Sequence, residues 1–321
     1  MTAAVQTLWA EVVVGALADG GVEFVVVSPG SRSTPLAIAL ARNSRLAIEV
    51  VIDERAAAFV ALGRARASGR PTALVCTSGT AAAHYFPAII EAGQADIPLI
   101  ALTADRPPEL QDAGAPQTID QRKLFGDHVR GFAELGAPGG GALGLRAARR
   151  AIAQAVQLAR GPRPGPVHVN VPLRKPLEPA APATDEERAL AEVAMELAAH
   201  PLIAPAPRTI ASDAAIAAII RAIAGAPRGL IVAGPAAVDR DREAAFALAR
   251  ATGFPLLAEA TSQLRFGRPD DVVACDAFDL VLAARKTDPA LVPDLIVQLG
   301  GEPTAGGWAP WLATHDAPRW V

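Results

Sequence analysis

IEVVIDERAAAF, residues 48–59, joins a run of β-branched residues to a run of helix-forming residues. The first five residues, 48–52, predict a short buried β-strand, and the alanines that follow favour an α-helix. Asp53, Glu54 and Arg55 fall at the junction. Ligands of an open parallel sheet bind at the carboxyl ends of its strands, so Glu54 is a candidate proton-exchanging group. Burial there would raise the pKa of its carboxyl group towards neutrality.

The same junction also has a purely structural interpretation. Asp53 could cap the N-terminus of the helix, and Glu54 could occupy the first turn, where the helix dipole favours negative charge. On this stretch alone the structural interpretation is the stronger prediction. The choice therefore depends on what the other strand ends contribute.

A pattern of strand, polar loop and helix recurs along the first half of the chain. Repeats in this order predict a doubly wound, mostly parallel sheet flanked by helices. The predicted strands are residues 24–27, 48–52, 72–76, 97–103 and 165–171. The predicted helices are residues 3–19, 36–42, 81–93 and 145–160, besides the helix that starts near Ala56.

A second α/β pattern follows a proline-rich segment. We predict an α/β domain over residues 1–175, a linker over 176–208 with a short helix near 186–199, and a smaller domain of the same class over 209–321. Residues 317–321 resemble the start of a further strand, as in a chain cut from a longer protein. The second domain's predicted strands and helices are residues 229–234, 255–258, 295–299, 212–224, 239–252 and 276–285.

Composition narrows the class of protein. The chain has 321 residues, of which 51% are hydrophobic but only 4% aromatic, so its cores must be built from small side chains. Its net charge is −3 and no basic run stands out, which argues against nucleic-acid binding. No apolar run is long enough for a membrane span, and the first residues lack a signal-peptide pattern. Cys76 and Cys275 lie far apart, so a reducing cytoplasm is the expected location.

Four polar loops should meet at one rim of the first sheet, because each follows a parallel strand. They combine the Glu54 carboxylate with the guanidinium groups of Arg32 and Arg106, and Gln117 could add an amide. This combination predicts a site for a small anion beside one proton-exchanging carboxylate. The hydroxyl and glycine residues of these loops are Ser31, Ser33, Thr77, Ser78, Thr80, Gly30 and Gly79.

Several common motifs are missing or misplaced. No His or Cys cluster has metal-ligand spacing, and neither a nucleophile elbow nor a P-loop is present. Residues 139–144 match G-x-G-x-x-G, but no convincing strand precedes them and no acidic residue lies about 20 residues later. We interpret them as a glycine-rich lead into the following helix. His168 lies within a predicted strand, where a packed or hydrogen-bonded role is expected.

Six segments of the chain form a recognisable set. They are VSPGSRSTP (27–35), IDER (52–55), TSGTA (77–81), LTADRPPEL (102–110), GAPQ (114–117) and GPVHVNVP (165–172). Together they closely resemble the 2-succinyl-5-enolpyruvyl-6-hydroxy-3-cyclohexene-1-carboxylate (SEPHCHC) synthases, thiamine-diphosphate enzymes of menaquinone biosynthesis. The resemblance is specific through residue 175 and mainly architectural beyond it. It implies a pyrimidine-binding domain followed by a central domain truncated at its C-terminal end.

The resemblance also implies roles for individual residues. Glu54 matches the catalytic carboxylate that hydrogen-bonds the aminopyrimidine ring of thiamine diphosphate. No metal ligand is expected in this chain, because Mg²⁺ and the diphosphate are held in a C-terminal domain with no counterpart here. The implied cofactor-binding residues are Pro29, Gly30, Glu54, Thr77, Ser78 and Gly79. The residues that match isochorismate-holding positions are Ser31, Arg32, Arg106 and Gln117.

The implied activity is that of a transferase in a homodimer or homotetramer. It decarboxylates 2-oxoglutarate and adds the succinyl carbanion to isochorismate, releasing CO₂. This two-domain fragment is expected to be inactive alone. Relatives often carry a basic residue near Gly306 or Gly307, where this sequence has none.

Two alternatives stay open. One is another thiamine-diphosphate decarboxylase or carboligase, against which Arg32 and Arg106 argue because they suit a dicarboxylic acceptor. The other is a non-catalytic α/β module that binds an anion or a partner chain.

Overall fold

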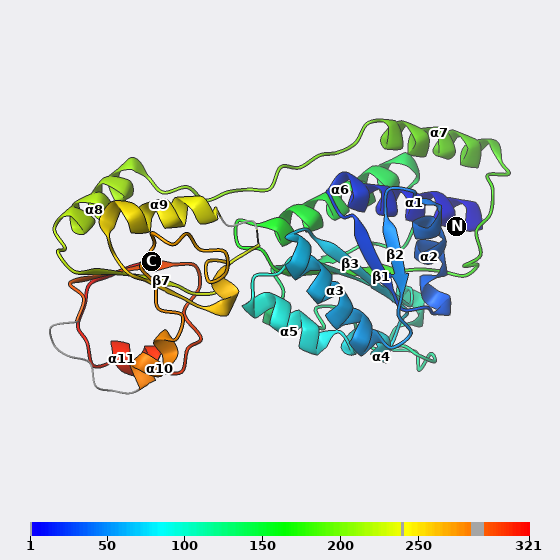
Figure 1. Ribbon diagram of the computed structural model, residues 1–321. Helices are drawn as coiled ribbons and strands as arrows, with labels where there is room; N and C mark the ends of the chain where they lie inside the picture. The colour runs from blue at the N-terminus through cyan, green and yellow to red at the C-terminus, as the bar shows by residue number, and fades with distance from the viewer. Residues whose placement is uncertain (1, 239–240, 284–291) are drawn as a thin grey trace. The chain divides into compact units, whose positions relative to one another are not determined.

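The chain divides into two compact units, Met1–Thr209 and Ile210–Val321. The computed structural model describes residues 2–238, 241–283 and 292–321 (Figure 1). Each unit contains one all-parallel sheet flanked by helices, which confirms the predicted α/β class. Among the described residues, no helix has the length and hydropathy needed to cross a membrane.

The first unit is built on a six-stranded sheet of order β2-β1-β3-β4-β6-β5. Because the order places β3 and β4 at the centre, their residues are buried throughout, whereas β2 and β5 form the edges. The strands are β1 (Phe24–Val27), β2 (Ala47–Val50), β3 (Thr72–Cys76), β4 (Leu99–Asp105), β5 (Gly131–Glu134) and β6 (Pro166–Pro172).

Helices cover both faces of this sheet (Figure 1). One face carries α1 (Ala3–Asp19), α2 (Thr34–Arg42), α6 (Gly141–Arg160) and α7 (Asp185–Ala199). The other carries α3 (Glu54–Ser68), α4 (Thr80–Ala83) and α5 (Phe86–Gln94). Alanines fill much of the contact between α3 and the sheet, as the composition predicts, so helix and strands pack closely.

The prediction of a buried strand over residues 48–52 was wrong in its burial. β2 ends at Val50, and all four of its residues are exposed. Val50 is 64% exposed and Ile52 is 82% exposed. The physical reason is position, since β2 pairs only with β1 and lies at the edge of the sheet. A β-branched run indicates a strand but does not distinguish a central strand from an edge strand.

Two further elements differ from the predictions. The predicted helix over residues 81–93 is divided into α4 and α5, with Pro87 in the first turn of α5, where its missing N–H costs no hydrogen bond. β5 follows the irregular segment and was not predicted, although it pairs with β6 along its whole length.

Residues 176–208 were interpreted as a linker, and the helix predicted there is α7. A capping box formed by Thr184 and Glu187 starts this helix, and Thr2 Oγ1 donates to Glu187 Oε1 at 2.5 Å. Leu190 and Leu197 of α7 are buried in the core shared with α1 and α6. The structure therefore groups this segment with the first unit. The functional assignment of the domains stays a prediction.

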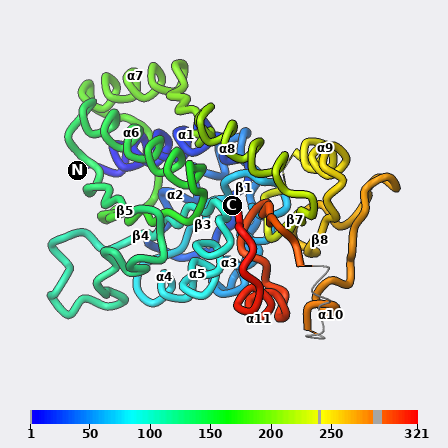
Figure 2. Tube along the Cα trace, turned by 90° about the vertical axis from the view of Figure 1, so that its left-hand side faces the viewer, coloured from blue at the N-terminus to red at the C-terminus, as the bar shows by residue number. Residues whose placement is uncertain are grey.

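The second unit contains a four-stranded sheet of order β10-β9-β7-β8. The chain trace in Figure 2 marks the positions of β7 and β8. Its strands are β7 (Gly229–Ala233), β8 (Leu256–Ala258), β9 (Leu295–Leu299) and β10 (Arg319–Trp320). Its helices are α8 (Asp213–Ala224), α9 (Arg242–Thr252), α10 (Phe278–Ala283) and α11 (Trp308–Leu312). β10 pairs in parallel with β9, which confirms the strand expected at the end of the chain.

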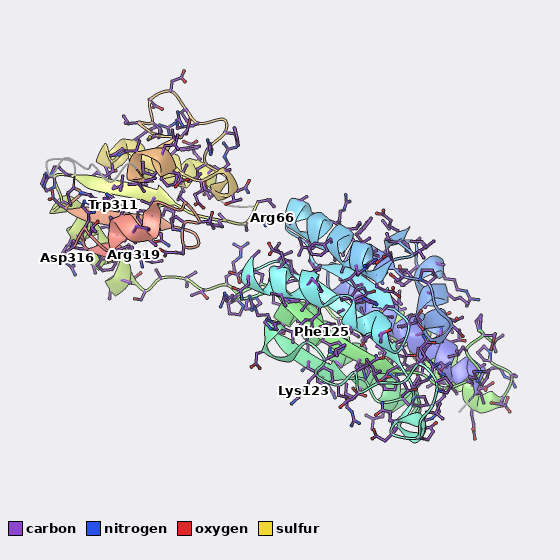
Figure 3. All side chains as sticks on the ribbon, turned by 90° about the horizontal axis from the view of Figure 1, so that it is seen from below. Arg66, Lys123, Phe125, Trp311, Asp316 and Arg319 are labelled. Carbon is purple, nitrogen blue, oxygen red and sulfur yellow. The ribbon has the colours of Figure 1, made fainter. Side chains whose placement is uncertain are left out.

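The core of the second unit has two parts. α9 and the partly buried side of α8 pack on one side, while α10 and α11 contribute to a separate cluster that includes Trp308 and Trp311. The Trp311 ring, labelled in Figure 3, stacks on Trp308 and on His315, with ring centroids 5.7 and 4.6 Å apart. Of the predicted helices 239–252 and 276–285, residues 239–240 and 284–285 lie outside the described residues.

Candidate functional site

The loops that follow β1 and β3 are in direct contact. A Cβ added at Gly30 would lie 2.4 Å from Thr77 Cβ, so only glycine fits at this crossing. Thr77 Oγ1 accepts a hydrogen bond from the backbone N–H of Arg32 at 3.3 Å. Pro29 and Ser31 are exposed on either side of Gly30, whereas Thr77 is buried. The rim predicted from the strand pattern therefore forms between these two loops.

Arg32 is a buried cation with too few acceptors. Its side chain lies just before α2, and the residue is only 5% exposed. Nη1 donates to the carbonyl of Leu173 at 2.6 Å, while the buried Nε has no hydrogen-bond partner among the described residues. Burial lowers the pKa of Arg32, and the nearby charge of Arg106 lowers it further. A negatively charged ligand would satisfy the hydrogen bond and balance the charge.

Arg106, Ser78 and Gln117 form a second group at the rim. Arg106 Nη1 donates to Ser78 Oγ at 2.6 Å, and Ser78 Oγ donates to the carbonyl of Gln117 at 3.1 Å. In return, Gln117 Nε2 donates to the carbonyl of Ser78 at 2.9 Å. Gly79 has φ +87°, and a Cβ there would lie 3.0 Å from Gln117 Cγ, so this turn requires glycine.

A cavity of about 610 Å³ opens beside these groups. Arg32 and Arg106 both line it, so the two arginines predicted to hold a substrate face one space. The remaining lining residues are Pro107, Glu109, Leu110, Ala115, Pro116, Arg174 and Lys175. Four of the nine are basic and one is acidic, which favours an anionic ligand.

Glu54 lies at the start of α3 and is half-buried. Asp53 caps this helix, because its carboxylate accepts the backbone N–H of Arg55 at 2.9 Å and also pairs with the Arg55 guanidinium. This contact holds the pKa of Asp53 well below its usual range. The capping interpretation of Asp53 is thus confirmed.

Glu54 lies close enough to Cys76, the last residue of β3, to influence its thiol. Burial raises the pKa of the Cys76 thiol, and the negative charge of Glu54 contributes to that rise, which puts the carboxylate near the end of β3. Within the described residues, no hydrogen bond or ion pair joins Glu54 to Arg32, Ser78 or Arg106. The catalytic role of Glu54 stays a prediction.

A buried polar network beneath the rim was missed by the sequence analysis. Gln121 is fully buried, and its Oε1 accepts the backbone N–H of Gly79 at 2.7 Å. Its Nε2 donates to Asn170 Oδ1 at 3.0 Å and to the carbonyl of Ala104 at 3.2 Å. Asn170 Nδ2 in turn donates to Asp105 Oδ2 at 2.8 Å. Gln121 therefore ties the Gly79 turn to β4 and β6.

His168 ends this network inside the sheet. Its Nε2 lies 2.8 Å from Thr103 Oγ1, which also donates to Asn170 Oδ1. The ring packs against Phe125, labelled in Figure 3, and Phe132, with centroids 4.8 and 5.0 Å away. Burial lowers the pKa of His168 to about 4. A packed, hydrogen-bonded histidine is what the sequence analysis predicted. The alternation of His168 and Asn170 with valines in β6 was the signal for a buried polar face.

The chain is similar to known proteins across the region that contains this rim. Residues 9–124 match the family described as "Thiamine pyrophosphate enzyme, N-terminal TPP binding domain". Over 98% of its length the chain is 51% identical to the SEPHCHC synthase of Sorangium cellulosum, of which it covers 52%. It is 44% identical to the synthases of Halorubrum lacusprofundi and Geobacillus kaustophilus, covering 53% and 54% of them.

Over nearly its whole length the chain is therefore similar to part of the SEPHCHC synthases, and residues 9–124 are similar to the N-terminal domain of thiamine pyrophosphate enzymes. The chain spans about half the length of the curated relatives it matches. The matched residues 9–124 contain the rim residues of the loops described above, from Pro29 to Gln117. The domain description that matches this rim is that of enzymes that bind thiamine pyrophosphate.

The rim residues suit the aminopyrimidine half of this cofactor in their chemistry. Glu54 provides a half-buried carboxylate at the start of α3. The turn around Gly79 leaves no room for a Cβ on the Gln117 side. Within the described residues, no group of three or more His, Cys, Asp or Glu side chains could hold a metal ion.

Proposed function

We propose that this chain provides the pyrimidine-binding and acceptor-binding part of a SEPHCHC synthase. The complete protein would be a transferase that decarboxylates 2-oxoglutarate and joins the succinyl unit to isochorismate, a step of menaquinone biosynthesis. The observation that carries the proposal is the cavity lined by Arg32 and Arg106, since the buried Nε of Arg32 has no hydrogen-bond acceptor among the described residues and the two guanidinium groups face one space.

Each residue of the rim has a distinct task in this proposal. Thiamine diphosphate, when bound, supplies the nucleophilic carbon that 2-oxo acid decarboxylation requires. Glu54 holds a proton at the ring nitrogen of the aminopyrimidine. Arg32 and Arg106 hold a carboxylate of isochorismate, and Ser78 orients Arg106 through its 2.6 Å hydrogen bond. The burial of Arg32 strengthens its electrostatic attraction to a carboxylate, because water screens the charge less.

In this proposal, the described residues do not hold the diphosphate of the cofactor or its metal ion. In a protein of the relatives' length, further chain holds the diphosphate through Mg²⁺, so the 321-residue chain alone is inactive. The complete enzyme acts in the cytoplasm as a homodimer or homotetramer. Residues 1–175 form the pyrimidine-binding domain, and residues 209–321 the central domain.

Two measurements test these roles. In the complete enzyme, Glu54→Gln should abolish deuterium exchange at the thiazolium carbon of bound thiamine diphosphate, because Gln cannot exchange the proton; retained exchange would contradict the assigned role.

In the 321-residue chain, Arg106→Gln should weaken isochorismate binding at least about tenfold, since a charge-assisted hydrogen bond contributes about 1.5–3 kcal/mol. Arg163→Gln, which changes a surface arginine paired with Asp96, is the matched control.

The cavity also favours a second candidate function, a non-catalytic module that binds a small anion. Such a module would bind isochorismate or another dicarboxylate in the cavity, yet the complete protein would show no exchange at the thiazolium carbon. A substrate screen on the complete protein separates SEPHCHC synthase from other thiamine-diphosphate carboligases, because only the former requires isochorismate as the acceptor.

A further inference from the structure

The segment after β6 forms one wall of the anion-binding cavity. Leu173 accepts the Nη1 hydrogen bond of Arg32, and the next two residues, Arg174 and Lys175, line the cavity. Neither basic residue was singled out by the sequence analysis. Both residues come much later in the sequence than the rim loops, so only the fold brings them to the cavity.

The backbone of this wall is fixed by a buried glutamine of α1. Gln6 is 2% exposed, and its Nε2 donates to the carbonyls of Arg174 and Pro176, both at 2.8 Å. Its Oε1 accepts the backbone N–H of Arg174 at 3.0 Å. With every hydrogen-bonding group of the Gln6 amide directed at this segment, the wall presents Arg174 at a defined position.

The Arg174 side chain is occupied by an acid of the same cavity. Its Nε and Nη2 donate to the two carboxylate oxygens of Glu109 at 2.5 and 2.8 Å. This two-point hydrogen bonding to Arg174 lowers the pKa of Glu109 to about 2, so the carboxylate is ionised at neutral pH. The pair has the geometry with which an arginine binds a ligand carboxylate.

The pair is also replaceable. The side chains of Arg174 and Glu109 are 35% and 51% exposed, so the ion pair is partly hydrated. Glu109 can therefore rotate away from Arg174 towards solvent with little loss of free energy. Glu109 is the single acid against four bases in the cavity wall, and Arg32 Nε is left without an acceptor. Glu109 therefore neutralises only part of the positive charge of the wall.

We propose that Arg174 is a second carboxylate-binding residue of the cavity and that Glu109 occupies it until a ligand arrives. A ligand with two carboxylates then contacts Arg32 and Arg106 with one and displaces Glu109 from Arg174 with the other. Lys175 adds positive charge beside the second position. Arg174 and Glu109 thus select dicarboxylates over monocarboxylates. The identification of isochorismate as the natural dicarboxylate rests on the proposed function, but the two-point site does not.

Calorimetric titration of the 321-residue chain tests the proposal with three ligands. Isophthalate carries two carboxylates on one ring, benzoate carries one, and isochorismate is the proposed substrate. Native protein should bind isophthalate at least about tenfold more tightly than benzoate, and Arg174→Gln should remove most of that difference. Glu109→Gln should tighten isophthalate binding several-fold, because no internal ion pair has to be broken.

The controls separate this inference from folding defects and from the proposed function. Arg188→Gln removes an arginine from a surface pair with Asp185 on α7 and should change none of the affinities. Circular dichroism of each variant checks that it is folded, and Arg174→Lys keeps the charge but loses the two-point geometry, so it should recover only part of the selectivity. Unchanged isophthalate affinity in folded Arg174→Gln, beside weaker binding in Arg106→Gln, would overturn the inference alone. Selective isophthalate binding without isochorismate binding would instead overturn the proposed substrate and leave the site intact.

Discussion

At the scale of single residues, the candidate site depends on buried polar groups that touch no ligand. Gln121 holds the backbone of the Gly79 turn, and Asn170 holds Gln121 in place. His168 supports the same network through Thr103 while staying neutral, because burial disfavours its charged form. The rim residues are thus oriented by a network whose protonation state matters for folding.

The lowered pKa of His168 predicts a pH-dependent stability. The folded pKa is about 4 and the ordinary value is 6.5, so in this range the unfolded chain binds a proton that the folded chain does not. Stability should therefore fall as pH falls through 6.5 towards 4. Between pH 7 and pH 5 this single group should cost about 2 kcal/mol, since one pKa unit corresponds to about 1.4 kcal/mol.

Urea denaturation of native protein and His168→Gln at the two pH values measures this effect. The variant is expected to be less stable at both values, because Gln fills the ring site poorly. The free energy of unfolding of the native protein should nevertheless fall more between pH 7 and pH 5 than that of the variant. An equal fall in both proteins would show that His168 titrates normally in the folded state.

At the scale of elements, the sequence pattern predicts the type and order of helices and strands well. It predicts poorly whether an element is buried or lies at an edge. The strands over residues 24–27, 72–76 and 295–299 are found at the predicted positions, since apolar runs bounded by polar loops are strong signals. The edge position of β2 and the docking of α7 depend on contacts with residues distant in sequence, so local patterns cannot contain them. The same holds for Arg174, which reaches the cavity only through the position of β6.

In the candidate site too, residues next to strands could be predicted from the sequence, and residues placed by long-range contacts could not. Arg32, Ser78 and Arg106 were identified because they follow strands, whereas Gln117 was assigned a role by the family resemblance; the structure brings all four together. Gln121 lies in an irregular segment that carries no pattern of its own. Its partners are in the Gly79 turn after β3, on β4 and on β6, and only the assembled sheet places them around one amide.

The close contact at Gly30 between the loops after β1 and β3 predicts that a larger residue there destabilises the fold. Gly30→Ala should push the loop after β1 away from Thr77, because the added Cβ would overlap the Thr77 side chain. Overpacking of this kind typically costs about 1–3 kcal/mol, and isochorismate binding should weaken with it because Arg32 follows in the same loop. Thermal denaturation and calorimetry measure the two effects.

Gly63→Ala is the matched control for this substitution. Gly63 lies inside α3, and a Cβ there would meet nothing within 4 Å. Alanine should therefore stabilise the chain by about 0.5–1 kcal/mol through its higher helix propensity, with binding unchanged. Equal stability of native protein and Gly30→Ala would mean that the two loops can separate without cost.

At the scale of the whole molecule, the segment that starts from β2 leaves apolar surface uncovered. Ile48, Val50 and Ile52 are 37%, 64% and 82% exposed, and Phe59 and Val60 on α3 are 49% and 37% exposed. β2 is also a sheet edge, with backbone hydrogen-bonding groups available on its outer side. The chain spans about half the length of its curated relatives, and the proposed homo-oligomer would need a surface of this kind.

This surface predicts concentration-dependent self-association of the 321-residue chain. Val50→Lys places a charge on the exposed edge strand, where it disfavours both apolar contact and edge-to-edge pairing, so it should shift the chain towards monomer. Leu143→Lys is the control, because Leu143 is 75% exposed on α6, away from the β2–α3 segment in sequence. Light scattering over a range of concentrations gives the mass of each protein. A native chain that stays monomeric at every concentration, with Val50→Lys indistinguishable from it, would mean that this apolar surface does not bind a second copy.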